Sequence, residues 1–186
     1  MKKIRPPLTE EVVKSLKAGD EVLISGAIYT ARDMAHKRMC EELQGGGRLP
    51  FELEGSIIYY CGPTPARPGK VVGAAGPTTS SRMDAFSPKL YAAGVKATIG
   101  KGYRSEEVIA ALKKNCAVHL SAVGGAGALL SKYIRGSRII AYEDLGAEAI
   151  RELEVEDFPV TVAYDSEGNS VYKNEEYRIQ NTEYKI

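Results

Sequence analysis

Three cationic side chains follow short apolar runs that we interpret as strands, and each has Gly, Thr or Ser close by. They are Arg32, Arg82 and Lys101. In α/β proteins, binding sites are built where strands end and helices begin. An arginine fork matches a carboxylate with two hydrogen bonds, and a lysine supplies a compact charge. The three residues therefore predict a site for an organic anion, and an anion with two carboxylates fits them best.

Short hydroxyl side chains stand immediately before Arg82, where a helix is predicted to start. They are Thr78, Thr79, Ser80 and Ser81. The start of a helix presents free N–H groups and a partial positive charge, which favour an anion. The same segments contain no obvious carboxylate pair and no metal cage. We therefore expect half of a catalytic site, which holds an anionic substrate but lacks an electrophile.

Glycine-rich turns raise the alternative of a nucleotide site, which their spacing disfavours. A P-loop needs about four residues between its first Gly and the Gly-Lys pair, followed by Ser or Thr. Here five residues separate Gly94 from Gly100, and Gly102 takes the place of the hydroxyl residue. The Gly125-Ala126-Gly127 turn lacks the third glycine of a dinucleotide fingerprint. We interpret these glycines as tight turns between strand and helix.

The cysteines and histidines give no independent indication of metal or hydrolytic chemistry. Cys40, Cys61 and Cys116 lack the closely spaced pattern of iron–sulfur ligands, so no metal ligand is predicted in this chain. We interpret Cys61 and Cys116 as small buried side chains. No Gly-x-Ser-x-Gly elbow of a hydrolase is present. His119 lies in an apolar strand as a packing residue, whereas His36 either orients the site or packs.

Strands and helices alternate through most of the chain, which predicts the α/β class and a single domain over residues 1–186. Thr9, Thr30 and Ser105 are predicted helix caps, and Arg38 is spaced to pair with Glu42 on one helix face. We expect helices over 9–19, 30–43 and 105–115, another after Pro77 that Pro88 breaks or kinks, and helical turns over 128–134. We expect strands over 22–24, 56–61, 71–76, 98–102, 117–123 and 138–142, a hairpin over 160–172, and a mobile tail over 174–186.

Charge and hydropathy exclude several classes of partner. The 186 residues carry 25 Lys and Arg against 24 Asp and Glu, a net charge of +1. Such a balance gives no general footprint for nucleic acid or an anionic membrane. No apolar run is long enough to span a bilayer, and no apolar segment of a secretory signal follows the basic start. Three widely spaced cysteines form a poor disulfide framework, so we expect a cytoplasmic protein.

Five segments, in this order and spacing, resemble one known family. The set is similar to the β subunit, or C-terminal domain, of the class I iron–sulfur fumarate hydratases and the related tartrate dehydratases. The most specific parts are the Gly-Pro-Thr-Thr-x-x-Arg-Met-Asp and Ile-Gly-Lys-Gly motifs, and the resemblance extends from about Leu8 to Tyr172. The segments are residues 26–38, 60–63, 73–84, 99–102 and 122–128.

This resemblance implies a swivelling β/β/α fold and the reversible hydration of fumarate to L-malate. It implies a [4Fe-4S] cluster on a partner α subunit, whose open iron acts as a Lewis acid, and a dimer of α/β pairs. Carried over by motif, Arg32, Arg82 and Lys101 would bind the substrate, and Thr78 would take the proton from carbon. Thr79 and His36 would support the site, and this chain would hold no metal.

Two points of chemistry qualify these implications. Some relatives have Ala-Gly where this chain has Ser80-Ser81. A threonine hydroxyl is a very weak base in water, so Thr78 would need nearby cations to stabilise its alkoxide, or a relay to another group. Arg82 and Lys101 are suited to that role.

Two alternatives to a fumarate hydratase subunit remain. One is a tartrate dehydratase or another hydratase of a small dicarboxylate, and the other is a stand-alone anion-binding module.

Overall fold

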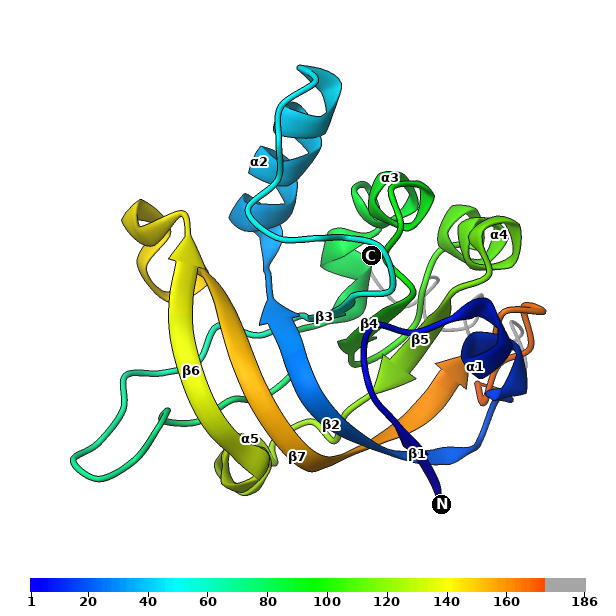
Figure 1. Ribbon diagram of the computed structural model, residues 1–186. Helices are drawn as coiled ribbons and strands as arrows, with labels where there is room; N and C mark the ends of the chain where they lie inside the picture. Colours follow the sequence, from blue (N-terminus) through cyan, green and yellow to red (C-terminus); the bar gives the residue numbers. More distant parts are fainter. Residues whose placement is uncertain (173–186) are drawn as a thin grey trace, which may run out of the picture.

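The computed structural model describes residues 1–172, in which seven strands form one mixed sheet (Figure 1). The strand order is β1-β2-β3-β4-β5-β7-β6, and β7 also pairs with β2. Strands β1 to β5 run parallel, whereas β7 is antiparallel to β2, β5 and β6. The strands are β1 (Lys2–Ile4), β2 (Glu21–Thr30), β3 (Ile57–Tyr59), β4 (Ala97–Gly100), β5 (Val118–Ser121), β6 (Ile134–Ala141) and β7 (Ile150–Tyr164).

Because β7 pairs with both β2 and β5, strands β2, β3, β4, β5 and β7 form a closed ring of pairings. Side chains of a strand alternate between its two faces. In β3, Ile57 and Tyr59 belong to one core cluster, whereas Ile58 and the following Tyr60 belong to a second. The first cluster contains apolar residues of all seven strands and of the short helices α1 (Glu10–Ser15) and α5 (Gly127–Leu130). The second cluster lies between the sheet and the helices α2 (Asp33–Gln44), α3 (Ser87–Ala92) and α4 (Glu106–Asn115).

Helices α2, α3 and α4 lie along one side of the sheet, and α5 lies on the opposite side (Figure 1). Two caps that the sequence predicts are confirmed: Thr9 Oγ1 accepts from the Val12 N–H, and Ser105 Oγ accepts from the Val108 N–H. The helices are α1 (Glu10–Ser15), α2 (Asp33–Gln44), α3 (Ser87–Ala92), α4 (Glu106–Asn115) and α5 (Gly127–Leu130), with 3-10 turns η1 (Ser80–Met83), η2 (Ser131–Tyr133) and η3 (Glu143–Glu148).

The α/β class is confirmed, and the ring of strands with outer helices agrees with a swivelling β/β/α domain. The predicted mobile tail over 174–186 lies outside the described residues. Among the described residues, no helix combines the length and the apolar character needed to cross a bilayer.

The second strand corrects the sequence prediction at both of its boundaries. Gly26 does not end the strand, because a shift of register between Ile24 and Gly26 lets the pairing with β7 continue to Thr30. Thr30 is therefore the last residue of β2 and not a helix cap, and Arg32 occupies the cap position of α2. In place of a capping hydroxyl, a carboxylate oxygen of Glu148 accepts from the Met34 N–H at 2.9 Å.

Helix α2 also pairs differently from the prediction. Arg38 forms a two-bond ion pair with Asp144 of η3, at 2.7 and 2.8 Å, rather than with Glu42. Glu42 accepts a hydrogen bond from the Tyr142 hydroxyl at 2.8 Å. Both partners lie 100 or more residues away along the chain, so helical spacing could not indicate them.

Two further predictions about loops and helices are wrong. Residues 71–76 form no strand, because their hydrogen bonds go to Thr64 and to Gly127 of α5. They belong to a long excursion after β3, which Figure 1 shows extending away from the sheet. The predicted helix after Pro77 is only the turn η1, and Pro88 lies in the first turn of α3, where a missing N–H costs nothing. The sequence prediction also missed β1 and the first two thirds of β7.

Candidate functional site

The segment that carries Thr78 lies across the carboxyl ends of β3 and β4. The Thr78 N–H donates to Tyr60 O at 2.7 Å, and the Ser80 N–H donates to Lys101 O at 2.8 Å. Between them, Thr79 pairs in parallel with Lys101. The backbone of Thr78 is therefore fixed by the sheet, and its hydroxyl is left free of any hydrogen bond among the described residues.

Gly100 permits this close approach. A Cβ at Gly100 would overlap Ser80 Oγ and lie 2.8 Å from Cδ2 of Tyr60. The glycine of the Ile-Gly-Lys-Gly motif therefore serves packing. Because Gly100 has no side chain, the Thr78–Ser80 segment packs directly against β4, and Lys101 follows at the end of this strand.

The structure brings Arg32 and Arg82 to one carboxylate. Asp33 Oδ1 accepts from Arg82 Nε at 2.8 Å, and Asp33 Oδ2 lies 3.9 Å from Arg32 Nε. Glu148 adds a second acid, 3.4 Å from Arg32 Nη2. The Arg32 guanidinium lies over Gly62, where an added Cβ would come within 3.2 Å of Arg32 Nη1. Arg32 Nε is buried and has no hydrogen-bond partner among the described residues.

Lys101 reaches the same edge of the sheet from β4. Its side chain lies along Gly124, where an added Cβ would come within 3.3 Å of Lys101 Cδ. Among the residues that the structure describes, the Lys101 amine has neither an ion pair nor a hydrogen bond. Arg32 and Lys101 thus follow β2 and β4 at their carboxyl ends. Arg82 was predicted to follow a strand over 71–76, but that strand is absent, and Arg82 lies instead in η1. Among the described residues, Lys101 keeps an unpaired charge.

Sequence reasoning missed the acids that hold the arginines. Asp33 directly follows Arg32 in the sequence, and that proximity was the available signal. Asp84 stands close to Arg82 but bonds a different arginine, Arg104. Glu148 lies in η3, far along the chain, and nothing local indicated it.

A buried arginine was also missed. Arg104 is 1% exposed and lies beneath the site, with its Nε 2.7 Å from Asp84 Oδ1. Arginine is rarely buried unless it is paired, so sequence reasoning assigns such a residue to the surface. Here Asp84 accepts from both the Arg104 guanidinium and the Ser105 N–H, which ties η1 to the start of α4.

Both histidines are fully buried. His119 is confirmed as an interior residue of β5. His36 Nδ1 lies 2.8 Å from Arg32 O, and its ring meets the Tyr60 ring edge-on at 5.2 Å between centroids. Burial lowers the pKa of His36 to about 4, so the ring is neutral at neutral pH. His36 therefore packs beneath Arg32 and contacts its backbone.

The thiols do not suit a metal. Cys40 and Cys61 are buried and belong to different core clusters, whereas Cys116 is half-buried at the left-handed cap of α4 and corrects the expectation of burial there. Burial raises the pKa of the Cys61 thiol to about 12, which disfavours the thiolate that a metal requires. Within residues 1–172, no three His, Cys, Asp or Glu side chains gather as a metal site.

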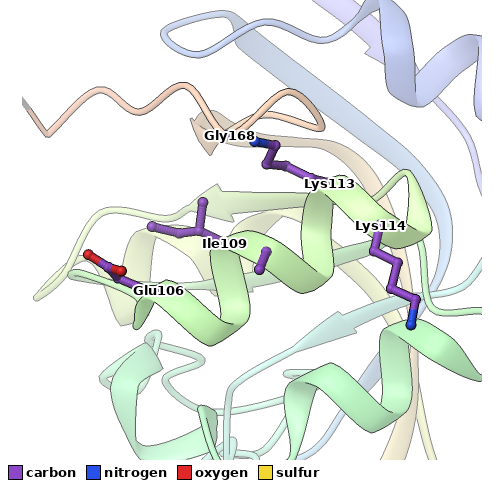
Figure 2. Close-up of a pocket in the computed structure, with 6 residues that line it drawn as sticks. Glu106, Ile109, Lys113, Lys114 and Gly168 are labelled. Atoms are coloured by element: carbon purple, nitrogen blue, oxygen red, sulfur yellow. The ribbon is translucent and has the colours of Figure 1, made fainter.

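A separate hollow lies beside α4. A cavity of about 650 Å³ opens between α4 and the turn after β7 (Figure 2). Its lining includes Glu106, Ile109, Lys113 and Gly168, and none of the three predicted cations. Figure 2 shows the Lys113 side chain extending toward Gly168. This hollow is separate from the edge that carries Thr78.

Arg32 and Lys101 follow the carboxyl ends of β2 and β4, and the Thr78–Arg82 segment lies across β3 and β4, so the fold is an α/β domain with a cationic edge. The chain belongs to the Fumarase C-terminus family, whose model matches residues 2–175. It is 41% identical over 172 residues to the "Putative L(+)-tartrate dehydratase subunit beta" of Methanocaldococcus jannaschii, covering 89% of this chain and 88% of that protein.

Two fumarate hydratases are similar along most of this chain. Fumarate hydratase 2 of Leishmania major is 37% identical over 172 residues, covering 91% of this chain and 29% of that protein. The aerobic class I fumarate hydratase of Escherichia coli (strain K12) is 37% identical over 152 residues, covering 81% of this chain and 28% of that protein. The chain thus spans less than a third of each of these two hydratases.

Proposed function

We propose that this chain is the β component of a two-component hydro-lyase that adds water reversibly to fumarate and yields L-malate. The observation that carries the proposal is the edge of the sheet at which Arg32 and Lys101 follow β2 and β4, where Asp33 bonds Arg82 and the Thr78 backbone is bonded to Tyr60 O. Two arginine forks and one ammonium offer three cationic groups to the two carboxylates of a small substrate. Membership of the Fumarase C-terminus family agrees with this assignment.

Arg82 is oriented for a carboxylate. Asp33 engages Nε only, and the two terminal nitrogens of Arg82 have no hydrogen bond among the described residues. Those nitrogens form the end of the fork, which binds both oxygens of a carboxylate. About half of the side chain is exposed, so a substrate reaches it from solvent or from a partner chain.

Lys101 and Thr78 would act on the other end of the substrate. The unpaired Lys101 amine would bind the second carboxylate, with Arg32 beside it. In the dehydration direction, the alkoxide of Thr78, whose own proton has passed to solvent, would then take the proton from carbon, since no hydrogen bond among the described residues competes for this oxygen. Cations nearby lower the pKa of a hydroxyl because they stabilise its anion, which makes this role chemically accessible. Thr79 and His36 would support this arrangement, Thr79 through its pairing with Lys101 and His36 through Arg32 O.

The residues of this chain do not fit an iron–sulfur cluster. The thiols are dispersed, and the most buried of them resists ionisation. We therefore infer that a [4Fe-4S] cluster belongs to a partner α subunit. The remainder of each fumarate hydratase, more than two thirds of its length, has no counterpart in this chain and would correspond to that partner. A dimer of α/β pairs in the cytoplasm completes the proposal, and the free cysteines suit a reducing compartment.

Tartrate is the second candidate substrate. The observation that favours it is the match along 88% of a protein named as a tartrate dehydratase subunit. The same cationic edge would bind its two carboxylates. Fumarate and tartrate differ in their central hydroxyl groups, so the choice would depend on hydrogen bonds near Thr78 and Ser81 rather than on the cations.

The test is a substrate comparison with the assembled complex. The chain is co-expressed with a cluster-bearing α subunit, and initial rates are measured with fumarate, L-malate, L-tartrate and methylfumarate. Turnover fastest with fumarate and malate supports the proposal, whereas turnover of tartrate alone replaces it by the second candidate. A chain that binds no cluster-bearing partner and turns over none of these acids would be a stand-alone anion-binding module, and the proposal would be wrong.

A further inference from the structure

The turn that carries Arg82 is held from below by two buried polar residues. On one side of Arg82, Ser80 Oγ lies 3.0 Å from His119 Nε2. On the other side, Asp84 accepts from Arg104 Nε at 2.7 Å. Ser80, His119 and Arg104 are all buried, at no more than 1% exposure. Hydrogen bonds to buried residues therefore hold the turn on both sides of Arg82, which is itself exposed.

Donor and acceptor chemistry decides where the His119 proton lies. A guanidinium only donates hydrogen bonds, so His119 Nδ1, which lies 3.1 Å from Arg104 Nη1, must be an acceptor. The Thr98 hydroxyl lies 2.8 Å from the same nitrogen and can donate to it as well. Since Nδ1 accepts, the neutral ring carries its proton on Nε2 and donates it to Ser80 Oγ.

We propose that Arg104 and His119 are positioning residues: Arg104 holds His119 as the neutral tautomer with its proton on Nε2, and this proton fixes Ser80 and with it the Thr78–Arg82 turn. The expected effect on catalysis rests on the proposed function, whereas the tautomer of His119 does not depend on it. A substrate-binding group that is displaced by about 1 Å can cost roughly a hundredfold in rate, so fixing this turn matters.

Two observations support the neutral state of His119. Burial and the adjacent Arg104 charge both lower its pKa, so that protonation is disfavoured at neutral pH. The hydroxyl groups bonded to Thr98 and Arg104 are also uncharged. Tyr91 OH lies 2.6 Å from Thr98 Oγ1, and Arg104 donates to the hydroxyls of Tyr60 and Ser87. Among the described residues, Asp84 is the acid paired with Arg104.

The second histidine supplies an internal reference. His36 Nδ1 lies 2.8 Å from Arg32 O, and a carbonyl only accepts, so His36 carries its proton on Nδ1. Its Nε2 has no partner among the described residues. The sequence contains two histidines in all, and the structure assigns them opposite tautomers.

The first test is long-range ¹H–¹⁵N correlation spectroscopy of the imidazoles in the full chain at pH 7. We expect one ring with the proton on Nε2 and the other with it on Nδ1, and His36→Asn assigns the signals by removing the second. A His119 ring that is charged, or that carries its proton on Nδ1, overturns the proposal. This result is independent of substrate, so it holds or fails whatever the complex catalyses.

The second test compares His119→Gln with His119→Leu in the assembled complex. The Gln amide can still donate to Ser80, so we expect kcat/KM within about threefold of the parent, whereas Leu lowers it by roughly tenfold to a hundredfold. Equal thermal midpoints show that folding is not the cause. If the Leu variant does not fold, Ser80→Ala replaces it, with an expected loss of about tenfold.

Parental kcat/KM in a folded His119→Leu or Ser80→Ala complex overturns the positioning role. A parent complex that turns over no dicarboxylate contradicts the proposed function instead, and the imidazole spectra separate these two failures.

Discussion

Asp33 joins two segments 49 residues apart by accepting a hydrogen bond from Arg82 Nε at 2.8 Å. Because Asp33 also begins α2 directly after Arg32, the carboxylate that bonds Arg82 also lies 3.9 Å from Arg32 Nε. The arginines would otherwise repel each other across the edge of the sheet. The terminal nitrogens of Arg82 have no acid partner among the described residues, and this is the group that we propose for substrate binding.

Arg82→Lys tests the requirement for a planar fork. The substitution keeps the charge but removes two-bond recognition, so we expect kcat/KM of the assembled complex to fall by about tenfold to a hundredfold. Arg135→Lys is the matched control, since Arg135 Nε also bonds one carboxylate, Glu156 at 2.7 Å, with comparable exposure of 55% against 49% for Arg82. Equal losses in both variants would show that the effect is not local to the site.

Lys101→Ala tests the unpaired amine. The amine has no ion pair among the described residues, so its removal should leave the thermal midpoint unchanged. We expect kcat/KM to fall by about a hundredfold, because a carboxylate desolvated at the site loses its counter-charge. Lys89→Ala is the control, an exposed lysine of α3 that also lacks an ion pair among the described residues. A Lys101→Ala complex with parental kinetics would exclude the amine from substrate binding.

Gly100→Ala tests the close packing beneath Thr78. The added Cβ would overlap Ser80 Oγ and press on Tyr60, so we expect the free energy of unfolding to fall by about 1 to 3 kcal/mol. Gly136→Ala in β6 is the control, because its Cβ would meet Glu154 at an ordinary 3.4 Å. That variant should change stability by about 0.5 kcal/mol or less. Urea unfolding of both variants gives the comparison, and equal stabilities would contradict the packing argument.

His36 predicts a pH dependence of stability. The unfolded chain takes up a proton at the ordinary pKa of 6.5, whereas the buried ring does so only near pH 4. The unfolded state therefore binds more protons in this window, and the free energy of unfolding falls as the pH decreases from 6.5 to 4, by up to about 3 kcal/mol. His36→Asn removes the titrating group, so its stability should fall less over the same window in urea titrations. Parallel profiles for parent and variant would contradict the assignment.

Sequence reasoning succeeded where the signal was local. Ser105 and Thr9 cap helices because their hydroxyls reach an N–H three residues away. The placement of Arg32 and Lys101 followed from another local fact, since each comes soon after a parallel strand, and parallel strands end at one edge. Arg82 does not share this basis, because the strand predicted before it does not form.

The remaining features depend on contacts between distant segments. In the sequence, Gly26 resembles the end of a strand. In the structure, pairing with β7 continues past Gly26 after a shift of register. The small residues over 71–76 resemble a strand but bond to Thr64 and to α5. Arg104 is buried only because Asp84, Ser87 and Tyr60 meet around it, and no spacing within its own segment indicates those partners.

The most direct test of the central claim is a structure of the assembled complex with a bound dicarboxylate. We expect its two carboxylates within hydrogen-bonding distance of the terminal nitrogens of Arg32, Arg82 and Lys101, with the Thr78 hydroxyl beside a substrate carbon. A dicarboxylate bound at the catalytic centre without contact to any of these three cations would contradict the account.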